Sequence, residues 1–388
     1  MKLKYEPLGK HIKLIDTRNR ENITDKVLGI NIDKFFMPSV ANVIGTDLSS
    51  YKLLSKGKFA CNPMHVGRDE RLPVALYNEN EPAIVSPAYF MFEIIDNSIL
   101  NEEYLMMWFR RPEFDRVCWL HTDGSVRGGI TWDDICRLEL PVPPFEEQLE
   151  IVASYKAITD RIALKRRIND NLEATAMTLF KSWFVDFEPF DCDKRGVPFN
   201  WQLTTLESRV STSTQSINPQ KIATSKVWHY SIPAFDSERL PCLDTAKDIL
   251  SNKYLVPADA ILVSKLNPET KRIWRTLRCF NDAICSTEFI VFNSLNKKHR
   301  AFYYLLFNTN QFIDFLVSNA TGSTNSRMRV KPASSLDFEF IVPPDDVLDR
   351  FCSEVEPLLS EIDNNLLETR KLSSLIPVAV AKMMSSSR

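Results

Sequence analysis

The sequence predicts a mixed α/β protein built by internal duplication. We expect two globular domains with small mixed sheets, separated by two long helices that pair as an antiparallel coiled coil. Two long stretches have apolar residues that alternate in steps of four and three, and the second stretch follows the first at an offset of about 200 residues. The segments upstream repeat at about the same offset, which indicates a duplicated architecture with a pseudo-twofold axis.

The first stretch begins after Pro143-Pro144, and its apolar positions form the seam of a coiled coil. These positions are Ile151, Tyr155, Ile158, Ile162, Leu172, Ala176, Leu179 and Trp183. The second stretch begins after Pro343-Pro344, and its seam is Phe351, Val355, Leu358, Ile362, Leu372, Ile376, Ala379 and Met383. Two polar seam positions also recur, as Lys165 and Asn169 and then as Asn365 and Thr369, and we expect them to set the register.

The repeat extends into the globular segments. The predicted strand AIVSPAYFMF at Ala83–Phe92 aligns with AICSTEFIVF at Ala283–Phe292, and Arg127 aligns with Arg327. The segment Glu102–Leu120 is predicted to be a helix that breaks at Pro112 and is followed by a second short helix. In the second copy, a helix is expected around residues 301–317.

Connectivity predicts the direction of the long helices. The first leads from domain one to domain two, so a second helix that packs on it must run back. About 39 helical residues would span roughly 58 Å. We expect domains at residues 1–144 and 188–344, with spacer helices at residues 145–187 and 345–388. Pro357 predicts a kink or a later start in the second helix, and Pro377 predicts a break or bend.

The composition is that of an ordinary globular protein, with 44% hydrophobic and 25% charged residues. No apolar run reaches the ~18 residues that span a bilayer, and the first residues lack the apolar core of a signal peptide, so we expect a cytoplasmic protein without a membrane partner. The eight cysteines and five histidines are scattered without zinc-type spacing, so no metal site and reduced thiols are expected.

Catalytic motifs are absent from the sequence. It contains no P-loop, dinucleotide fingerprint, nucleophile elbow or HExxH helix. The segment Asn62–His65 is the nearest approach to an adenine methyltransferase motif, but it lacks the second proline and the aromatic residue, so we interpret it as a turn. We therefore expect a protein that is not an enzyme and that holds no cofactor.

Two similar domains on a spacer suit recognition of a two-part target, and double-stranded DNA is the natural candidate. The candidate contacts are loops that combine Arg or Lys with small polar residues, which can bind phosphates and base edges. In the first domain they are Arg18, Asn19, Arg20, His65, Arg68, Arg71, Arg110, Arg111, Gly124, Ser125 and Arg127. In the second domain they are Lys265, Asn267, Lys271, Arg272, Arg275, Ser323, Thr324, Arg327, Arg329 and Lys331.

Some of these candidates have a simpler interpretation. Arg68 and Arg71 alternate with acidic residues, as in a solvated charged turn, and Arg110-Arg111 ends a helix, where cations favour the dipole. The loops with Arg127 and Arg327 are favoured because the arginine recurs in both halves. The run Lys271–Arg278, with its interleaved Trp274, is the strongest phosphate candidate.

The sequence LPVPPFEEQ at Leu140–Gln148 and the block KSWFVDFEPF at Lys181–Phe190 carry a family resemblance. Together with the two variable domains they make the chain resemble the specificity subunit of a type I restriction–modification system. The second copy departs from the pattern, because VPPDDVLDRF replaces the EEQ segment.

The resemblance implies two target recognition domains that each read half of an interrupted DNA sequence. It also implies that the helices dock two methyltransferase subunits, to which restriction/translocase subunits are added. S-adenosylmethionine, ATP and Mg are then expected on those partners only.

Two other functions stay open at this point. A modification enzyme fused to its own recognition domains would bind S-adenosylmethionine by itself. A coiled-coil scaffold that never contacts DNA is compatible with the net charge of −2, and it would show no salt-dependent DNA affinity.

Overall fold

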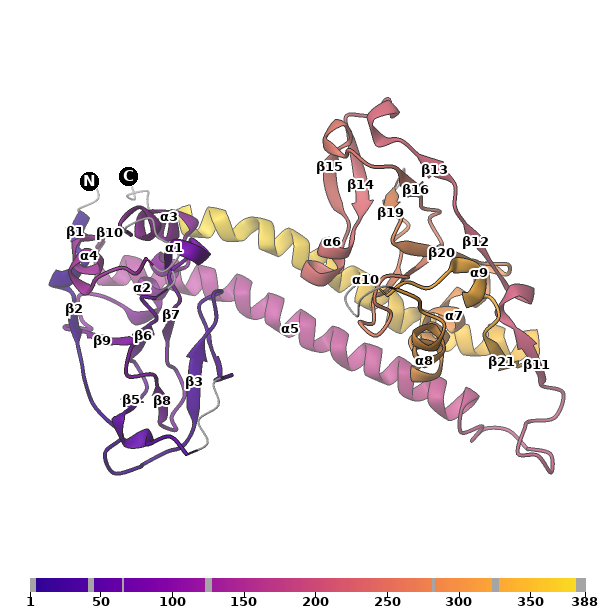
Figure 1. Cartoon of the computed structure of the whole chain (residues 1–388), viewed down its shortest axis with the longest axis horizontal. Coiled ribbons are helices and arrows are strands. Elements are labelled where there is room, and N and C mark those ends of the chain that lie inside the picture. The colour runs from indigo at the N-terminus through magenta and orange to yellow at the C-terminus, as the bar shows by residue number, and fades with distance from the viewer. Residues whose placement is uncertain are drawn as a thin grey trace. The chain divides into compact units, whose positions relative to one another are not determined.

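The computed structural model describes residues 5–40, 45–64, 66–122, 128–280, 283–322 and 328–381 (Figure 1). The chain divides into two compact units. The first unit is Met1–Arg161 together with Leu372–Arg388, and the second unit is Ile162–Lys371. Both long helices therefore contribute residues to both units.

The first unit contains two four-stranded sheets and a separate strand pair. One sheet has the order β2-β9-β6-β7, the other has the order β4-β3-β8-β5, and β1 pairs with β10. The strands are β1 Tyr5–Pro7, β2 Ile12–Leu14, β3 Val27–Ile30, β4 Phe36–Pro38, β5 Lys52–Leu54, β6 Phe59–Cys61, β7 Val74–Leu76, β8 Ala83–Val85, β9 Phe90–Ile94 and β10 Glu139–Pro141. The short helices are α1 Val66–Asp69, α2 Glu102–Phe109, α3 Pro112–Leu120 and α4 Trp132–Arg137.

The second unit has a four-stranded sheet β12-β20-β17-β18, a five-stranded sheet β13-β16-β19-β14-β15 and the pair β11-β21. Its strands are β11 Gln202–Thr205, β12 Val210–Ser213, β13 Ser216–Ile217, β14 Lys226–Tyr230, β15 Cys242–Thr245, β16 Lys253–Leu255, β17 Ile261–Ser264, β18 Ile273–Arg275, β19 Ile284–Ser286, β20 Phe289–Ser294 and β21 Glu339–Val342. Its short helices are α6 Ile232–Glu238, α7 Arg300–Phe307, α8 Asn310–Ser318 and α9 Pro332–Ser335.

The sheet topologies confirm the duplication. The order β2-β9-β6-β7 corresponds strand for strand to β12-β20-β17-β18. Each second sheet contains one parallel pair, β3 with β8 and β14 with β19. The predicted helix break at Pro112 is confirmed, and the second copy has the same two helices, α7 and α8. The second unit adds α6 between β14 and β15, where the first unit has a turn between β3 and β4.

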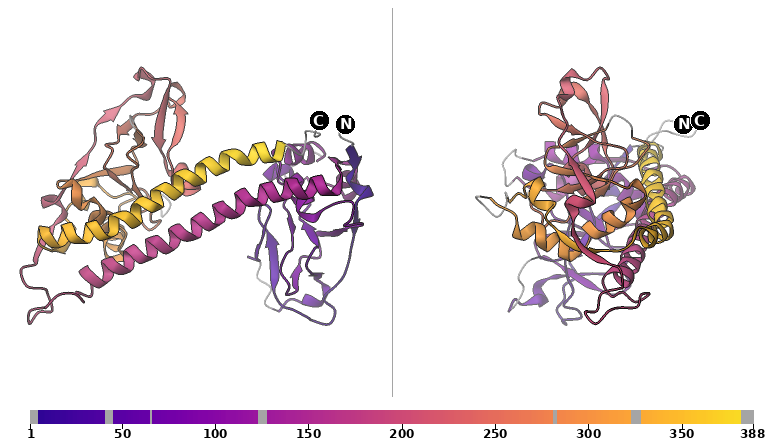
Figure 2. Two further views of the ribbon diagram at one scale, coloured as in Figure 1. Left: turned by 180° about the vertical axis from the view of Figure 1, so that it is seen from behind. Right: turned by 90° about the vertical axis from the view of Figure 1, so that its right-hand side faces the viewer.

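The long helices are α5, Phe145–Phe184, and α10, Asp345–Ala381. In the second unit they lie side by side and antiparallel (Figure 2). Lys165 pairs with Glu368, whereas Phe184, farther along α5, meets Phe351 edge to face near the start of α10. Lys165 Nζ also donates to Asn365 Oδ1 at 2.7 Å. Since these two residues are equivalent in the repeat, their contact places the twofold axis of this helix pair beside them.

The polar seam residues form one buried layer. Asn365 is fully buried, and its Nδ2 donates to Asn169 Oδ1 at 2.8 Å. The predicted seam residues Ile151, Tyr155, Ile158, Ile162, Leu172, Ala176, Leu179, Trp183, Phe351, Val355, Leu358, Ile362, Leu372, Ile376 and Ala379 are all buried or half-buried. Met383 lies outside the described residues.

The later start expected at Pro357 and the break expected at Pro377 are wrong, whereas a kink or bend at these prolines stays a prediction. Helix α10 begins at Asp345 and continues through Pro357 and Pro377 to Ala381. A proline removes one backbone hydrogen bond from a helix. Val355 and Leu359 are almost fully buried on either side of Pro357, and this apolar anchoring keeps the helix continuous there.

Aromatic side chains fasten the second unit's sheets to its helix pair. The Phe351 ring lies 4.6 Å from the Phe184 ring and 5.5 Å from the Trp183 ring, between centroids. Phe184 in turn contacts Phe302 of α7 at 4.9 Å. Such rings contribute buried area as well as favourable edge-to-face geometry.

We predict that Phe351→Ala lowers the free energy of unfolding by about 3–5 kcal/mol, because the truncation leaves a cavity among packed rings. The matched control is Phe199→Ala, since Phe199 is 62% exposed. Urea denaturation followed by tryptophan fluorescence measures both variants. Equal stability of the two would contradict the central role of Phe351.

Candidate nucleic-acid interface

Each unit brings two of the predicted loops together at one edge. In the first unit, Ile130 N donates to Pro63 O at 3.2 Å, and Gly67 N donates to Gly128 O at 3.0 Å. In the second unit, Val330 N donates to Lys265 O at 3.0 Å, and Asn267 N donates to Met328 O at 2.8 Å. The residues that follow segments 123–127 and 323–327 are therefore bonded to similar positions of the two copies.

His65, Gly124, Ser125, Arg127, Ser323, Thr324 and Arg327 lie outside the described residues.

Several predicted arginines form ion pairs within their own unit. Arg68 makes a two-point contact with Asp69 at 2.6 and 2.9 Å, and Arg329 does the same with Glu288 at 3.0 and 3.1 Å. Arg18 binds Asp16 at 2.6 Å. These pairs lie at half-exposed or exposed positions, where an ion pair contributes little to stability and can exchange partners.

Each copy has an ion pair at a similar place in the fold, although the paired residues are not equivalent in the repeat. Arg71 binds Asp33, in the turn between β3 and β4, at 2.9 Å. Arg272 binds Asp236, between β14 and β15, at 2.6 and 2.9 Å. Both arginines therefore connect corresponding parts of the two sheets, which gives them a structural role in each copy.

Three of the predicted contact residues have buried side chains, which does not favour a contact with DNA. Asn19 is fully buried, and its Nδ2 donates to Thr24 O at 2.9 Å. Arg111 is buried with its guanidinium 4.3 Å from the centre of the Trp108 ring. Arg275 is buried as well, and it binds acidic residues of α10.

The centre of the run Lys271–Arg278 is buried, so only the ends of this run could form the phosphate-binding surface that the sequence predicted. Trp274 is 3% exposed, and its Nε1 donates to Arg239 O at 3.0 Å. Lys271 Nζ donates to Asn308 O, and burial lowers the pKa of this lysine. Arg275, the basic residue of strand β18, is buried with its neighbours, whereas Lys271 and Arg278 at the two ends of the run are exposed.

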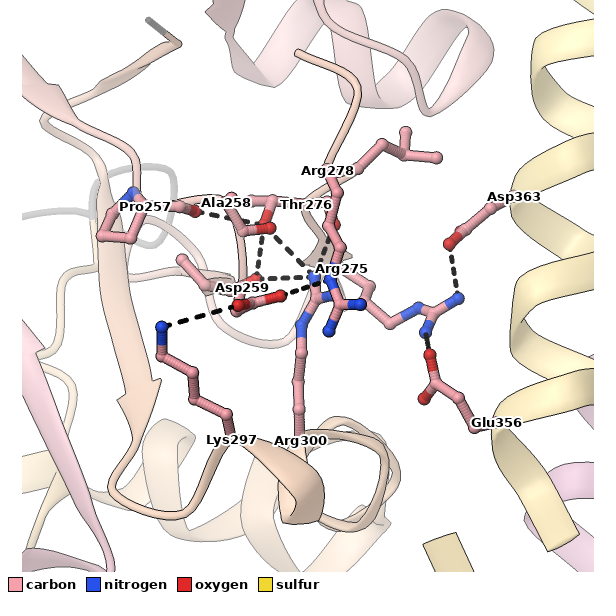
Figure 3. A network of polar contacts seen from close by, with 12 residues as sticks. Pro257, Ala258, Asp259, Arg275, Thr276, Arg278, Lys297, Arg300, Glu356 and Asp363 are labelled. Carbon is pink, nitrogen blue, oxygen red and sulfur yellow. Dashed lines mark hydrogen bonds and ion pairs between the residues drawn. The ribbon is translucent and has the colours of Figure 1, made fainter. Parts of the chain in front are cut away.

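Arg275 belongs to a buried polar network that joins β18 to α10 (Figure 3). Its Nη1 donates to Glu356 Oε1 at 2.9 Å, and its Nη2 donates to Asp363 Oδ2 at 2.5 Å. Burial raises the pKa of Asp363 to about 6, although Arg275 pulls in the opposite direction. Burial and the nearby Arg275 charge lower the pKa of Arg300 to about 10.

Other predicted residues remain accessible. Arg20 and Lys331 are exposed, whereas Lys265 and Asn267 are half-buried at the loop edge of the second unit. Lys265, Asn267, Arg329 and Lys331 flank the loop edge of the second unit, and Arg68 flanks that of the first. Arg71 and Lys271 are exposed as well.

The first unit also has an open hollow of about 680 Å³ between α1, α3 and the β3–β4 turn. Arg110, Arg116 and Trp119 line it, and Trp119 is 39% exposed. Arg116 and Trp119 were missed by sequence reasoning. Their spacing of three residues on a helix that leads into segment 123–127 was the available signal.

The described part of the chain shows no catalytic or metal centre. No group of three His, Cys, Asp or Glu side chains among the described residues could hold a metal ion. Among these residues, no helix is both long and apolar enough to cross a membrane.

The comparisons confirm the resemblance to type I specificity subunits. The sequence is 26% identical over 319 residues to the "Type I restriction enzyme MjaIX specificity subunit" of Methanocaldococcus jannaschii, covering 75% of this chain and 70% of that protein. It is 26% identical over 222 residues to the "Type I restriction enzyme HindI specificity subunit" of Haemophilus influenzae, covering 55% of this chain and 48% of that protein. No family model matches the sequence.

A solved structure shows that the fold is shared. The S subunit of a type I restriction–modification system from M. genitalium superposes with a TM-score of 0.61 at 12% identity, covering 100% of this chain and 97% of that one. The chain is thus a duplicated protein with two mixed-sheet units and a long antiparallel helix pair. Within that class, it has the fold of a type I S subunit.

The raised pKa of Asp363 gives a test of the network. Because the folded-state pKa of about 6 exceeds the usual value near 4, protonation favours the folded state. We predict that lowering the pH from 8 to 5 raises the unfolding free energy of the wild type by about 1 kcal/mol more than it raises that of Asp363→Asn.

Urea titrations at both pH values measure this difference. The control is Asp346→Asn, which removes an exposed carboxylate from the same helix and is expected to follow the wild type. A fall in relative stability at pH 5 would show that Arg275, rather than burial, dominates the titration of Asp363.

Proposed function

We propose that this chain is the non-catalytic DNA-recognition subunit of a type I restriction–modification system. It binds a two-part, interrupted target in double-stranded DNA and directs an adenine methyltransferase and restriction subunits to it. The observation that carries this proposal is the repeated loop edge, formed by the same backbone contacts in two copies of one fold on an antiparallel helix pair. The similarity to specificity subunits supports it.

Residues 1–144 and 188–344 serve as the two target recognition domains in this proposal, and residues 145–187 and 345–388 serve as the spacer helices. Each domain reads one half-site, because each has its own copy of the loop edge. The corresponding topology of the two copies supports equivalent roles, and their different loop sequences allow different half-sites to be read.

The DNA contacts are assigned to the loop edges. Segments 123–127 and 323–327 supply Arg127 and Arg327 for base or phosphate contacts, and Arg20 and Lys331 extend the basic surface. The net charge of −2 gives the protein no general attraction for DNA, so binding depends on these local cations and on salt concentration.

The partners in this proposal are two methyltransferase subunits on the helices, with restriction/translocase subunits added for cleavage. S-adenosylmethionine, ATP and Mg act on those partners. This part follows from the resemblance.

A DNA-independent scaffold is the second candidate, and the internal ion pairs favour it. Arg68, Arg71 and Arg272 are among the cations already paired with acidic residues. Measured affinity for DNA at several salt concentrations separates the two functions. A steep decline with salt supports recognition, and undetectable or salt-independent binding supports the scaffold.

The direct test is a methylation map of DNA from a host that expresses this chain with its methyltransferase partner. An interrupted motif with adenine methylated on both strands supports the proposal and identifies the target. Co-purification of the two proteins without any new methylation contradicts it.

We predict that Arg127→Ala weakens binding to one half-site and Arg327→Ala weakens binding to the other, each by about 1–3 kcal/mol. Competition binding with targets altered in one half measures the effect. Arg195→Ala, in the connection after α5, is the control. Equal losses for both halves from either variant would disprove the assignment of one domain to one half-site.

We also predict that deletion of seven residues from each long helix shortens the preferred gap by about three base pairs, because the helices lose roughly 10 Å. The half-site sequences themselves should persist. Methylation mapping of the shortened protein gives the new motif, and an unchanged gap would show that helix length does not set the spacing.

A further inference from the structure

We propose that Arg275 is a positioning residue that fixes the second recognition domain on α10. By doing so it narrows the range of gap lengths, meaning the number of base pairs between the two half-sites, that the protein accepts. This inference rests on the proposed function. It assigns a specificity role to a buried ion-pair network that contacts no DNA.

The position of Arg275 suits this role. Its side chain is 5% exposed on β18, the edge strand of the sheet β12-β20-β17-β18. The guanidinium binds Glu356 and Asp363, which are seven residues apart on α10 and therefore lie on one helix face, two turns apart. A planar group held at two such points restricts both sliding along the helix and rotation about it.

The strand that carries Arg275 is itself braced. Arg300, at the start of α7, donates from Nη2 to Ala260 O at 3.0 Å and also to Thr276 O. Thr276 Oγ1 donates to Ala260 O at 2.8 Å. Figure 3 shows Thr276 and Arg300 beside Arg275, so the backbone next to Arg275 is held in place by buried hydrogen bonds.

Other polar contacts also join this domain to the helices, such as Arg239 with Glu173 of α5 at 3.1 Å and His299 with Asp349 of α10 at 3.0 Å, but each of these two pairs is held at a single point. Apolar and stacking contacts complete the attachment. The rings around Phe351 pack one end of the domain onto the helix pair, and Phe351 and Asp363 are roughly 18 Å apart along α10. Farther along, Arg370 lies 4.8 Å from the centre of the Trp228 ring. Apolar and stacking contacts resist separation but tolerate small rotations, and the Arg275 ion pairs lie between them.

The first copy lacks this arrangement. By strand register, Leu76 occupies the position of Arg275, because Leu76 pairs with Phe59 as Arg275 pairs with Ile261. Ala163 is the residue of α5 that corresponds to Asp363. Since the shared fold forms without the ion pairs, their role is specific to the second domain.

If Arg275 only stabilised the fold, its replacement would change stability and leave the preference for one gap length unchanged. Loss of one partner of a buried ion pair destabilises a protein because it leaves an uncompensated charge, and this cost is smaller where water can reach the remaining charge. The Arg275→Met variant should therefore fold, with Glu356 and Asp363 hydrated at their partly exposed positions. If Arg275 positions the domain, the variant should lose part of its preference for the natural gap length. Its affinity for each half-site should stay the same.

The experiment uses the full chain with its methyltransferase partner, after the target motif has been mapped. Methylation rates are measured on duplexes whose gap is the natural length or one base pair longer or shorter. For Arg275→Met we expect the preference for the natural gap to fall by about tenfold, with unchanged preference within each half-site. The isosteric Asp363→Asn should reduce the preference in the same direction and should not add to the effect of Arg275→Met.

Arg278→Met is the matched control, because Arg278 lies three residues farther along the chain and pairs with Asp259 of its own domain at 2.6 Å. It should keep the wild-type gap preference. Unchanged selectivity in Arg275→Met, or an equal loss in Arg278→Met, overturns the positioning role. Absence of any two-part motif for the wild type would instead refute the proposed function.

If Arg275→Met does not fold, Glu356→Gln provides the same test, since Glu356 is 45% exposed and its replacement leaves the core intact. A measurable loss of gap preference in this variant supports the inference, and full retention contradicts it.

Discussion

The structure depends on the pairing of two unequal copies of one helix. Helices α5 and α10 have the same seam register, but their central polar residues differ, with Lys165 opposite Asn365 and Glu368. A buried polar layer costs stability and fixes register, because any shift would leave these groups without partners. Lys165 and Asn365 are equivalent in the repeat and contact each other, so the local twofold axis of the helix pair passes beside this layer.

Many of the basic residues predicted to contact DNA form ion pairs with acidic residues of the protein itself. The pairs Arg71–Asp33 and Arg272–Asp236 connect similar parts of the two copies. A protein with a net charge of −2 that acts on DNA must limit its attractive surface to a few places. The loop edges fit this requirement, because the same backbone hydrogen bonds hold them in each unit while their sequences differ.

The second copy shows how a duplicated fold can diverge. Gln148 fastens the start of α5 by donating to Ile99 O at 2.8 Å and Pro143 O at 2.9 Å, whereas its counterpart Leu348 is a core residue. The added helix α6 and the Arg275 ion pairs likewise belong to the second copy. These changes alter how the sheets attach to the helices and leave the strand order intact.

The sequence by itself determined the duplication, the long helices and the antiparallel pairing, because seam periodicity and a repeat offset are properties of the order of residues. It also carried the family resemblance through the segments at Leu140–Gln148 and Lys181–Phe190. Only the tertiary structure decided which arginines are accessible. Arg275 and Arg20 look alike in a sequence, yet one is buried against Asp363 and the other is exposed, because side-chain burial depends on elements that are distant along the chain.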